Sequence, residues 1–316
     1  MSSAAPARDL PVLFFQAGDA RHLPYTFWQA KHWAGGSPLI LLGDESNRHY
    51  RGRGLEHVPI RDFASAVSRL RDLYVHISSN TAEFEFFCLA RWLVMEEFAR
   101  RQGLREFLCL DSDVLIYAKP VDIVSRVPVC RMATVWFGDL GGKFASVSPG
   151  TTYIRDPSIL VEIQSHIMQF YSNPAEIENM RVGCEAMVRK KLGGVSDMFF
   201  LARCVHHLGG NIFNLWEPEK DGVVDMNIVQ ADGFRLREGI KEIEFRGGQP
   251  YAFYQPAGLW RRFSTLHFGG CCKKLMGRYL GRPANLNLAW ARLRERFRKG
   301  LAMNKAGDGA ITLDQS

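Results

Sequence analysis

The sequence predicts an α/β fold with a mostly parallel, Rossmann-like central sheet flanked by helices. In the first half of the chain, apolar runs rich in β-forming residues alternate with longer segments of helical periodicity, a pattern typical of parallel strands connected by helices. With 316 residues, 47% of them apolar, the chain is long enough to bury a substantial core. We assign residues 1–280 to the main domain and residues 281–316 to a small, basic helical extension with a tail.

The expected elements of the first half alternate between strand and helix. They are strand Val12–Phe15, helix Tyr25–Trp33, strand Leu39–Leu42, helix Ala82–Arg101 with Gly103 as its stop, and strand Phe107–Leu110. In the second half we expect an irregular Pro128–Pro149, a helical Leu160–Tyr171, a turn and helix over Gly193–Leu208, strands and turns over Lys241–Phe268, and a basic helix at Ala289–Leu301.

Charge, apolar runs and cysteines indicate which partners the chain can bind and in which compartment we expect it. The formal net charge is +7, and basic residues gather between Arg292 and Lys305. This cluster fits a solvated tail somewhat better than a site for an anionic membrane surface, which it could also attract. We expect no nucleic-acid partner, because this cluster lacks a groove-reading element. The apolar run from Pro11 to Phe15 is too short for a signal sequence or a membrane span. Seven cysteines without a CxxC pair favour a reducing cytosol, with any membrane contact peripheral and on the inner face.

The first motif with chemical potential is Asp111-Ser112-Asp113, directly after the strand Phe107–Leu110. Open α/β sheets bind ligands at the carboxyl ends of their strands. Two carboxylates one residue apart can reach the same divalent cation, which prefers oxygen ligands. A solvated turn produces the same pattern, so this motif alone does not decide between the two.

The second motif lies far away in sequence, at His267-Phe268-Gly269-Gly270-Cys271-Cys272-Lys273. A histidine at a strand end can supply an imidazole nitrogen to a metal that carboxylates already hold. The two glycines let the backbone approach a ligand closely, and Lys273 can meet phosphates. Taken alone, His267 is more typical of a packed or hydrogen-bonded histidine, and Lys273 of an exposed charge.

Together, in this order and each after a strand, the two motifs resemble those of the GT-A glycosyltransferases, most closely family 8 and its bacterial relatives. That family carries Asp-x-Asp at a strand end and His-x-x-Gly-x-x-Lys near the end of its catalytic domain, the spacing of His267, Gly270 and Lys273. The resemblance extends over about Val12 to Leu275. It implies a GT-A fold and metal-dependent transfer of a sugar from a nucleoside diphosphate donor, with UDP as the expected nucleotide.

The resemblance also implies roles for single residues. Arg91 stands where the family has a donor-contacting arginine, and Asp197 matches an Asp-Gln-Asp-like turn beside the sugar, although the glutamine is absent here. Asp44 follows the strand Leu39–Leu42, where the family holds the base and ribose. The implied metal ligands for Mn²⁺ or Mg²⁺ are Asp111, Asp113 and His267, the implied donor-binding residues are Asp44, Arg91, Ser112, Gly270 and Lys273, and the candidate catalytic residue is Asp197.

By resemblance, the product would retain the donor's anomeric configuration. If Asp197 is instead a general base on the opposite face of the sugar, the reaction would invert that configuration. The expected acceptor is a hydroxyl of a glycan or of a lipid-linked sugar, and a bacterial surface polysaccharide or lipopolysaccharide core is our hypothesis for it.

Two other functions remain open on sequence grounds. A sugar nucleotidyltransferase is one, because residues 17–24 resemble that family's phosphate loop, but with a single glycine. A non-catalytic module that binds nucleotide sugars is the other, and only turnover separates it from an enzyme.

Overall fold

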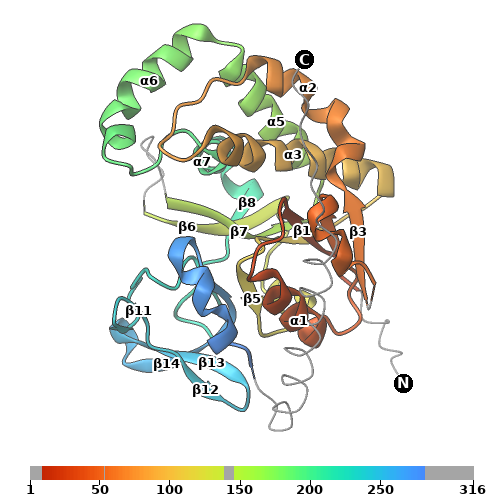
Figure 1. Ribbon diagram of the computed structural model, residues 1–316. Helices are drawn as coiled ribbons and strands as arrows, with labels where there is room; N and C mark the ends of the chain where they lie inside the picture. The colour runs from red at the N-terminus through yellow and green to blue at the C-terminus, as the bar shows by residue number, and fades with distance from the viewer. Residues whose placement is uncertain (1–8, 53, 139–145, 282–316) are drawn as a thin grey trace, which may run out of the picture.

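The computed structural model describes residues 9–52, 54–138 and 146–281. These residues form a seven-stranded, a five-stranded and a two-stranded sheet, with helices packed around the largest one (Figure 1). The expected α/β class with a mostly parallel central sheet is confirmed. The expected basic helix Ala289–Leu301 and nearly all of the 281–316 extension lie outside the described residues.

The large sheet has the strand order β3-β2-β1-β4-β7-β6-β8. Its strands are β1 (Val12–Gln16), β2 (Leu39–Gly43), β3 (Leu55–Pro59), β4 (Phe107–Leu110), β6 (Met132–Phe137), β7 (Ser146–Ile154) and β8 (Ile212–Asn214). Strands β3, β2, β1 and β4 are parallel, whereas β7 runs antiparallel to both of its neighbours. The carboxyl end of β4 therefore lies beside the middle of β7, with Leu110 opposite Thr151.

The prediction of irregular structure over Pro128–Pro149 is wrong, because this stretch contains β6 and the start of β7. Pro149 and Gly150 both lie within β7, and such residues usually mark a bulge or a break in a strand. The pairing register between β6 and β7 does shift between Ala133 and Val135. That irregularity accommodates residues that the sequence pattern assigns to a loop.

Helices cover both faces of the large sheet (Figure 1). The α-helices are α1 (Leu23–Trp33), α2 (Ala64–Leu73), α3 (Ala82–Gln102), α4 (Pro120–Ile123), α5 (Ser158–Tyr171), α6 (Pro174–Arg189) and α7 (Asp197–Leu208). The 3-10 helices are η1 (Glu45–Tyr50), η2 (Ile60–Phe63), η3 (Gly209–Asn211), η4 (Gln255–Ala257) and η5 (Gly270–Arg278). In the described part of the chain, no helix combines the length and the apolar character that crossing a bilayer requires.

Alternating side chains of β1 show how the two faces are packed. Leu13 and Phe15 belong to the core beneath α2, α3, α5 and α7, whereas Val12 and Phe14 belong to the core on the α1 side. Successive side chains of a strand point to opposite faces, so a fully buried strand carries an unbroken apolar run. Helix α3 begins after Thr81, whose Oγ1 accepts the Phe84 N–H, and it ends as expected at Gly103 in the left-handed region (φ +61°).

The small sheet has the order β12-β13-β14-β5. Its strands are β12 (Glu244–Arg246), β13 (Gln249–Tyr254), β14 (Leu259–His267) and β5 (Val114–Ile116); β9 (Val223–Val224) pairs with β14, and β10 (Leu236–Arg237) pairs with β11 (Ile240–Lys241). The antiparallel pair β14–β5 sets His267 opposite Val114. Because Val114 directly follows Asp113, this register brings the two sequence motifs together.

Helix α3 provides a matched test of this packing. Phe98 is 1% exposed, and Phe84, in the same helix, is 52% exposed. We expect Phe98→Ala to lower the free energy of unfolding by about 3–5 kcal/mol, because it opens a cavity in the core. The Phe84→Ala control should change it by roughly 0.5 kcal/mol or less. Denaturant unfolding of both variants measures the difference, and equal losses would contradict the orientation of α3.

Candidate functional site

Three side chains that can ligate a metal converge at the junction of the two sheets. Oxygen and nitrogen atoms of Asp111, Asp113 and His267 all lie within 4.8 Å of one another. The two aspartates follow β4, as expected, and His267 is the last residue of β14. Two carboxylates and an imidazole are a donor set that fits a divalent cation such as Mn²⁺ or Mg²⁺.

The backbone around His267 fixes the orientation of its ring. Nδ1 is hydrogen-bonded to the carbonyl oxygen of Met226, and Nε2 lies 3.4 Å from Oδ1 of Asp113. Burial alone would lower the pKa of His267, but the Asp113 carboxylate, with help from Asp111, raises this pKa to about 9. Nε2 therefore faces concentrated negative charge, which a proton or a divalent cation can neutralise.

Asp113 is buried and has two cationic neighbours. Besides His267, Nζ of Lys273 lies 3.1 Å from Oδ2 of Asp113. Burial by itself would raise the pKa of Asp113, yet His267 and Lys273 hold this pKa well below its usual range. The carboxylate is thus ionised at neutral pH. Gly270, three residues before Lys273, has φ +63°. The side chain of Lys273 is 39% exposed, so its ammonium group can also contact a bound anion.

Gly150 of β7 allows His267 to lie close to the large sheet. A Cβ atom at Gly150 would lie 2.8 Å from the imidazole carbon Cε1, closer than real contacts permit. The carbonyl oxygen of Gly150 accepts the N–H of Asp111 at 2.9 Å. A glycine at this position therefore lets both motifs pack against the same strand.

Ser112 is held inside the fold. Its Oγ donates to Oε1 of Gln16 at 2.6 Å and lies 3.0 Å from Nε2 of His22, and its carbonyl oxygen accepts the hydroxyl of Thr26. Burial, followed by the charge of Lys273, lowers the pKa of His22 to about 4, so this imidazole is neutral near pH 7. These contacts fix the turn between the two aspartates, and a direct contact of Ser112 with a donor stays a prediction.

Arg91 links the metal-ligand cluster to Asp197. Its Nη1 donates to Oδ1 of Asp111 at 2.6 Å, and its Nη2 forms an ion pair with Oδ2 of Asp197. Nε1 of Trp92 donates to the same Asp197 oxygen at 3.2 Å. Burial raises the pKa of Asp197, while the Arg91 cation opposes that shift. Two residues singled out from the sequence, Arg91 and Asp197, thus form one buried ion pair.

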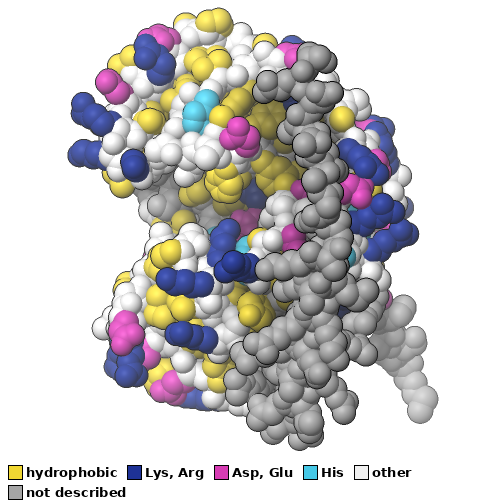
Figure 2. All heavy atoms as spheres, in the orientation of Figure 1, with side chains coloured by type: hydrophobic (Ala, Val, Ile, Leu, Met, Phe, Trp, Pro, Cys, Tyr) yellow, Lys and Arg dark blue, Asp and Glu magenta, His cyan; other side chains and the backbone are white. Residues whose placement is uncertain are grey.

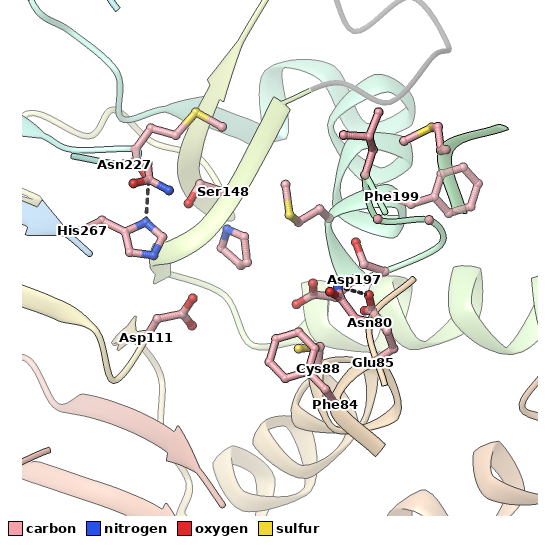
Figure 3. A pocket seen from close by; sticks show the side chains of 18 of the residues that line it. Asn80, Phe84, Glu85, Cys88, Asp111, Ser148, Asp197, Phe199, Asn227 and His267 are labelled. Carbon is pink, nitrogen blue, oxygen red and sulfur yellow. Dashed lines mark hydrogen bonds between the residues drawn. The ribbon is translucent and has the colours of Figure 1, made fainter. Parts of the chain in front are cut away.

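A cavity of about 620 Å³ adjoins this cluster, and Asp111, His267, Arg91 and Asp197 all line it. In Figure 3, Asp111 and His267 enter the space from one side, and Asp197 and residues of α3 enter from the other. Figure 2 shows the molecular surface hollowed between the helical part and the small sheet. This volume lies within the usual range for small-molecule sites.

Asp44 lies at the carboxyl end of β2, as expected, but its carboxylate is engaged locally. Its Oδ2 accepts the Gly18 N–H at 2.7 Å, and its Oδ1 accepts the Ser46 N–H at 3.0 Å. It lines a depression with Ser46 and Arg61 rather than the cavity beside the metal ligands. Asp44 therefore joins its own turn to the loop that carries Gly18, and its contact with a donor stays a prediction.

Sequence reasoning missed a buried charge cluster behind His267. Nζ of Lys241, a fully buried residue, lies 2.8 Å from Oδ1 of Asp225 and 3.3 Å from Oδ2 of Asp232. The other oxygen of Asp225 accepts the backbone N–H of His267 at 3.1 Å. Lys241 also donates to the carbonyl oxygen of Asn227 at 2.7 Å. The cluster thus fixes the segment whose Met226 carbonyl orients the imidazole.

No protein-family model matches this chain, and no curated protein matches it. Its fold is similar to those of several solved glycosyltransferases. One is mouse xyloside xylosyltransferase 1 in its apo form, with 10% identity, a TM-score of 0.42, and coverage of 66% of this chain and 86% of that one. Another is the galactosyltransferase LgtC in complex with donor and acceptor sugar analogues, with 12% identity, a TM-score of 0.39, and coverage of 67% and 75%.

A third is a glycosyltransferase involved in glycosylation of the major capsid of PBCV-1, with 10% identity, a TM-score of 0.42, and coverage of 85% of this chain and 99% of that one. At such identities and TM-scores, the similarity by itself does not establish an activity.

The buried cluster behind His267 can be tested through Lys241. We expect Lys241→Met to lower the free energy of unfolding by about 3–5 kcal/mol, because it leaves Asp225 buried without its cation. Adding Asp225→Asn should restore part of this loss by removing the uncompensated charge. Denaturant unfolding of the single and double variants tests this, and a fully stable Lys241→Met protein would contradict the assignment.

Proposed function

We propose that this protein is a metal-dependent glycosyltransferase of the GT-A type, which transfers a sugar from a nucleoside diphosphate donor to an acceptor hydroxyl. The observation that carries the proposal is the convergence of Asp111, Asp113 and His267 from two different sheets, beside the basic side chain of Lys273 and a cavity of sugar size. The similar solved structures are also glycosyltransferases, which agrees with this reading.

In this proposal Asp111, Asp113 and His267 hold Mn²⁺ or Mg²⁺. When bound, the cation supplies positive charge that stabilises a nucleoside diphosphate leaving group. Lys273, beside Asp113, adds a second positive charge, and its partly exposed ammonium group can bind the phosphates of the donor. By the family resemblance the nucleotide is UDP, and Gly270 lets the backbone come close to the diphosphate.

During transfer the acceptor oxygen forms a bond to the anomeric carbon, and the bond from that carbon to the diphosphate oxygen breaks. The acceptor proton leaves with the diphosphate. Asp197 can hold the sugar in place together with Arg91, since one of its oxygens already accepts from Arg91 and Trp92. By the family resemblance, the transfer retains the anomeric configuration of the donor sugar.

A sugar nucleotidyltransferase is less well supported. The backbone N–H of Gly18, which a phosphate-binding loop would direct at the nucleotide, instead donates to Asp44. A non-catalytic module that binds nucleotide sugars shares the geometry of the metal ligands, and turnover separates it from an enzyme.

Hydrolysis of the donor tests the role of the metal ligands. We expect Mn²⁺ or Mg²⁺ to support release of a nucleoside diphosphate from at least one nucleotide sugar in a panel, and a chelator to abolish it. Asp113→Ala should lower the rate by on the order of 10²-fold or more, because it removes a ligand at the leaving group. Asp72→Ala, on the exposed face of α2, is the matched control. Release that survives chelation, or equal losses in both variants, would contradict the proposal.

The second prediction concerns stereochemistry. With the donor found in that panel and an accepted glycoside, NMR of the product should show the anomeric configuration of the donor sugar. Asp197→Asn should then retain the same stereochemical outcome at a reduced rate. An inverted product would instead assign Asp197 the role of general base.

A further inference from the structure

A second cavity, of about 540 Å³, adjoins the other end of the β5–β14 pairing. Its walls come from the end of α1, from residues 117–126, from the loop around Gly222, and from β13 and β14. It shares no lining residue with the cavity beside the metal ligands. Ser264, in its wall, precedes His267 by three residues of β14, which corresponds to about 10 Å along the strand. The second cavity is therefore a separate place in the fold, and the proposed sugar transfer does not use it.

Two arginine side chains converge in this cavity. A Cβ atom added at Gly222 would lie 3.7 Å from Nη2 of Arg126 and 3.9 Å from Nη2 of Arg262, so both guanidinium groups reach the same small space. The same Cβ would lie 3.2 Å from Oγ of Ser264, and Gly222 has φ +87°, in the region that favours glycine. A glycine at this position therefore keeps the space between the two cations open.

Neighbouring carboxylates neutralise this positive charge only in part. Nε of Arg126 lies 3.6 Å from Oε2 of Glu217, but Glu217 also forms an ion pair with Lys220. The other cations of the lining are Arg262 and the exposed Lys119, and neither side chain forms an ion pair in the part of the chain that the structure describes. Guanidinium groups that face one space repel each other, and an anion between them would turn this repulsion into attraction.

The rest of the lining suits hydroxyl groups better than further negative charge. Asp122 and Asp221 also line the cavity and are exposed, and Oδ1 of Asp221 accepts the backbone N–H of Arg262 at 3.2 Å. Carboxylates repel a ligand that is anionic throughout, but they accept hydrogen bonds from hydroxyl groups. The cavity volume lies in the usual range for small-molecule sites. The lining therefore fits a small ligand with one anionic end and several hydroxyl groups.

We infer that this second cavity binds a sugar phosphate, with its phosphate between Arg126 and Arg262 and its hydroxyl groups toward Asp122 and Asp221. Guanidinium groups present paired N–H donors to phosphate oxygens, and one phosphate accepts from two of them at once. Lys119 adds a point charge at the exposed side of the cavity. This site is additional to the proposed donor site, and it stands whether or not the proposed function is correct.

The test is calorimetric titration of the full chain without metal, with glucose 6-phosphate, glucose and inorganic phosphate as separate probes. We expect glucose 6-phosphate to bind roughly 10-fold or more tightly than either of the other two, because only this probe engages both kinds of lining group. Lys119→Gln/Arg262→Gln should weaken its binding by about 10-fold or more, since charged donors are lost. The control Arg69→Gln/Lys190→Gln removes the same two residue types at exposed positions outside this cavity and should keep the affinity.

Thermal unfolding without ligand checks that both double variants remain folded. The single variant Lys119→Gln, at an exposed position, provides a second measurement and should weaken binding by about 3-fold or more. Equal affinity for the three probes, binding of none, or the same loss in both double variants would overturn the inference. Tighter binding of glucuronate than of glucose 6-phosphate would overturn the choice of a phosphate. If Lys273→Gln removes the binding instead, the probe occupies the metal-ligand site and the second site is wrong.

Discussion

The buried Arg91 side chain is the constraint on which the site depends. Its guanidinium joins Asp111, at the end of β4, to Asp197, at the start of α7, while Arg91 itself belongs to α3. Two carboxylates facing the same interior space would repel each other without this cation, and a lone buried guanidinium would be equally costly. The ion pairs therefore fix how far α7 lies from the strand that carries the metal ligands. The width of the cavity between Asp111 and Asp197 follows from one side chain.

Much of this arrangement could be predicted from the sequence, because strong local patterns mark it. The unbroken apolar run before Asp111 predicts a buried strand, and the abrupt change to acidic residues predicts its end at a ligand-binding edge. The spacing from His267 to Lys273 identified the second half of the site through family resemblance. Arg91 was placed by resemblance as well, although its partners were not foreseen. Local pattern thus predicts which elements exist and where they end.

The sequence could not show which strands share a sheet. Val114–Ile116 directly follows the metal motif, yet it pairs with β14 in a second sheet. Its partner residues, such as His267 opposite Val114, lie far away in the sequence, so no local pattern predicts this pairing. Strand β7 escaped prediction because Pro149 and Gly150 lie inside it. Lys241 gave no signal, since a lysine in a strand normally faces water, and its burial depends on partners elsewhere in the chain. Asp44 is the opposite case, because the sequence predicts its position at the end of β2 correctly, but its carboxylate accepts a hydrogen bond from the local turn.

The short connection between β4 and β5 has a mechanical consequence. Asp111 directly follows β4 of the large sheet, and Asp113 directly precedes β5 of the small sheet. Only one residue lies between the two aspartates. A cation held by both aspartates and by His267 would cross-link the two sheets at the point where the backbone passes from one to the other. Because a ligand that binds only the folded arrangement stabilises all parts it connects, metal binding would make the two sheets unfold as one cooperative unit.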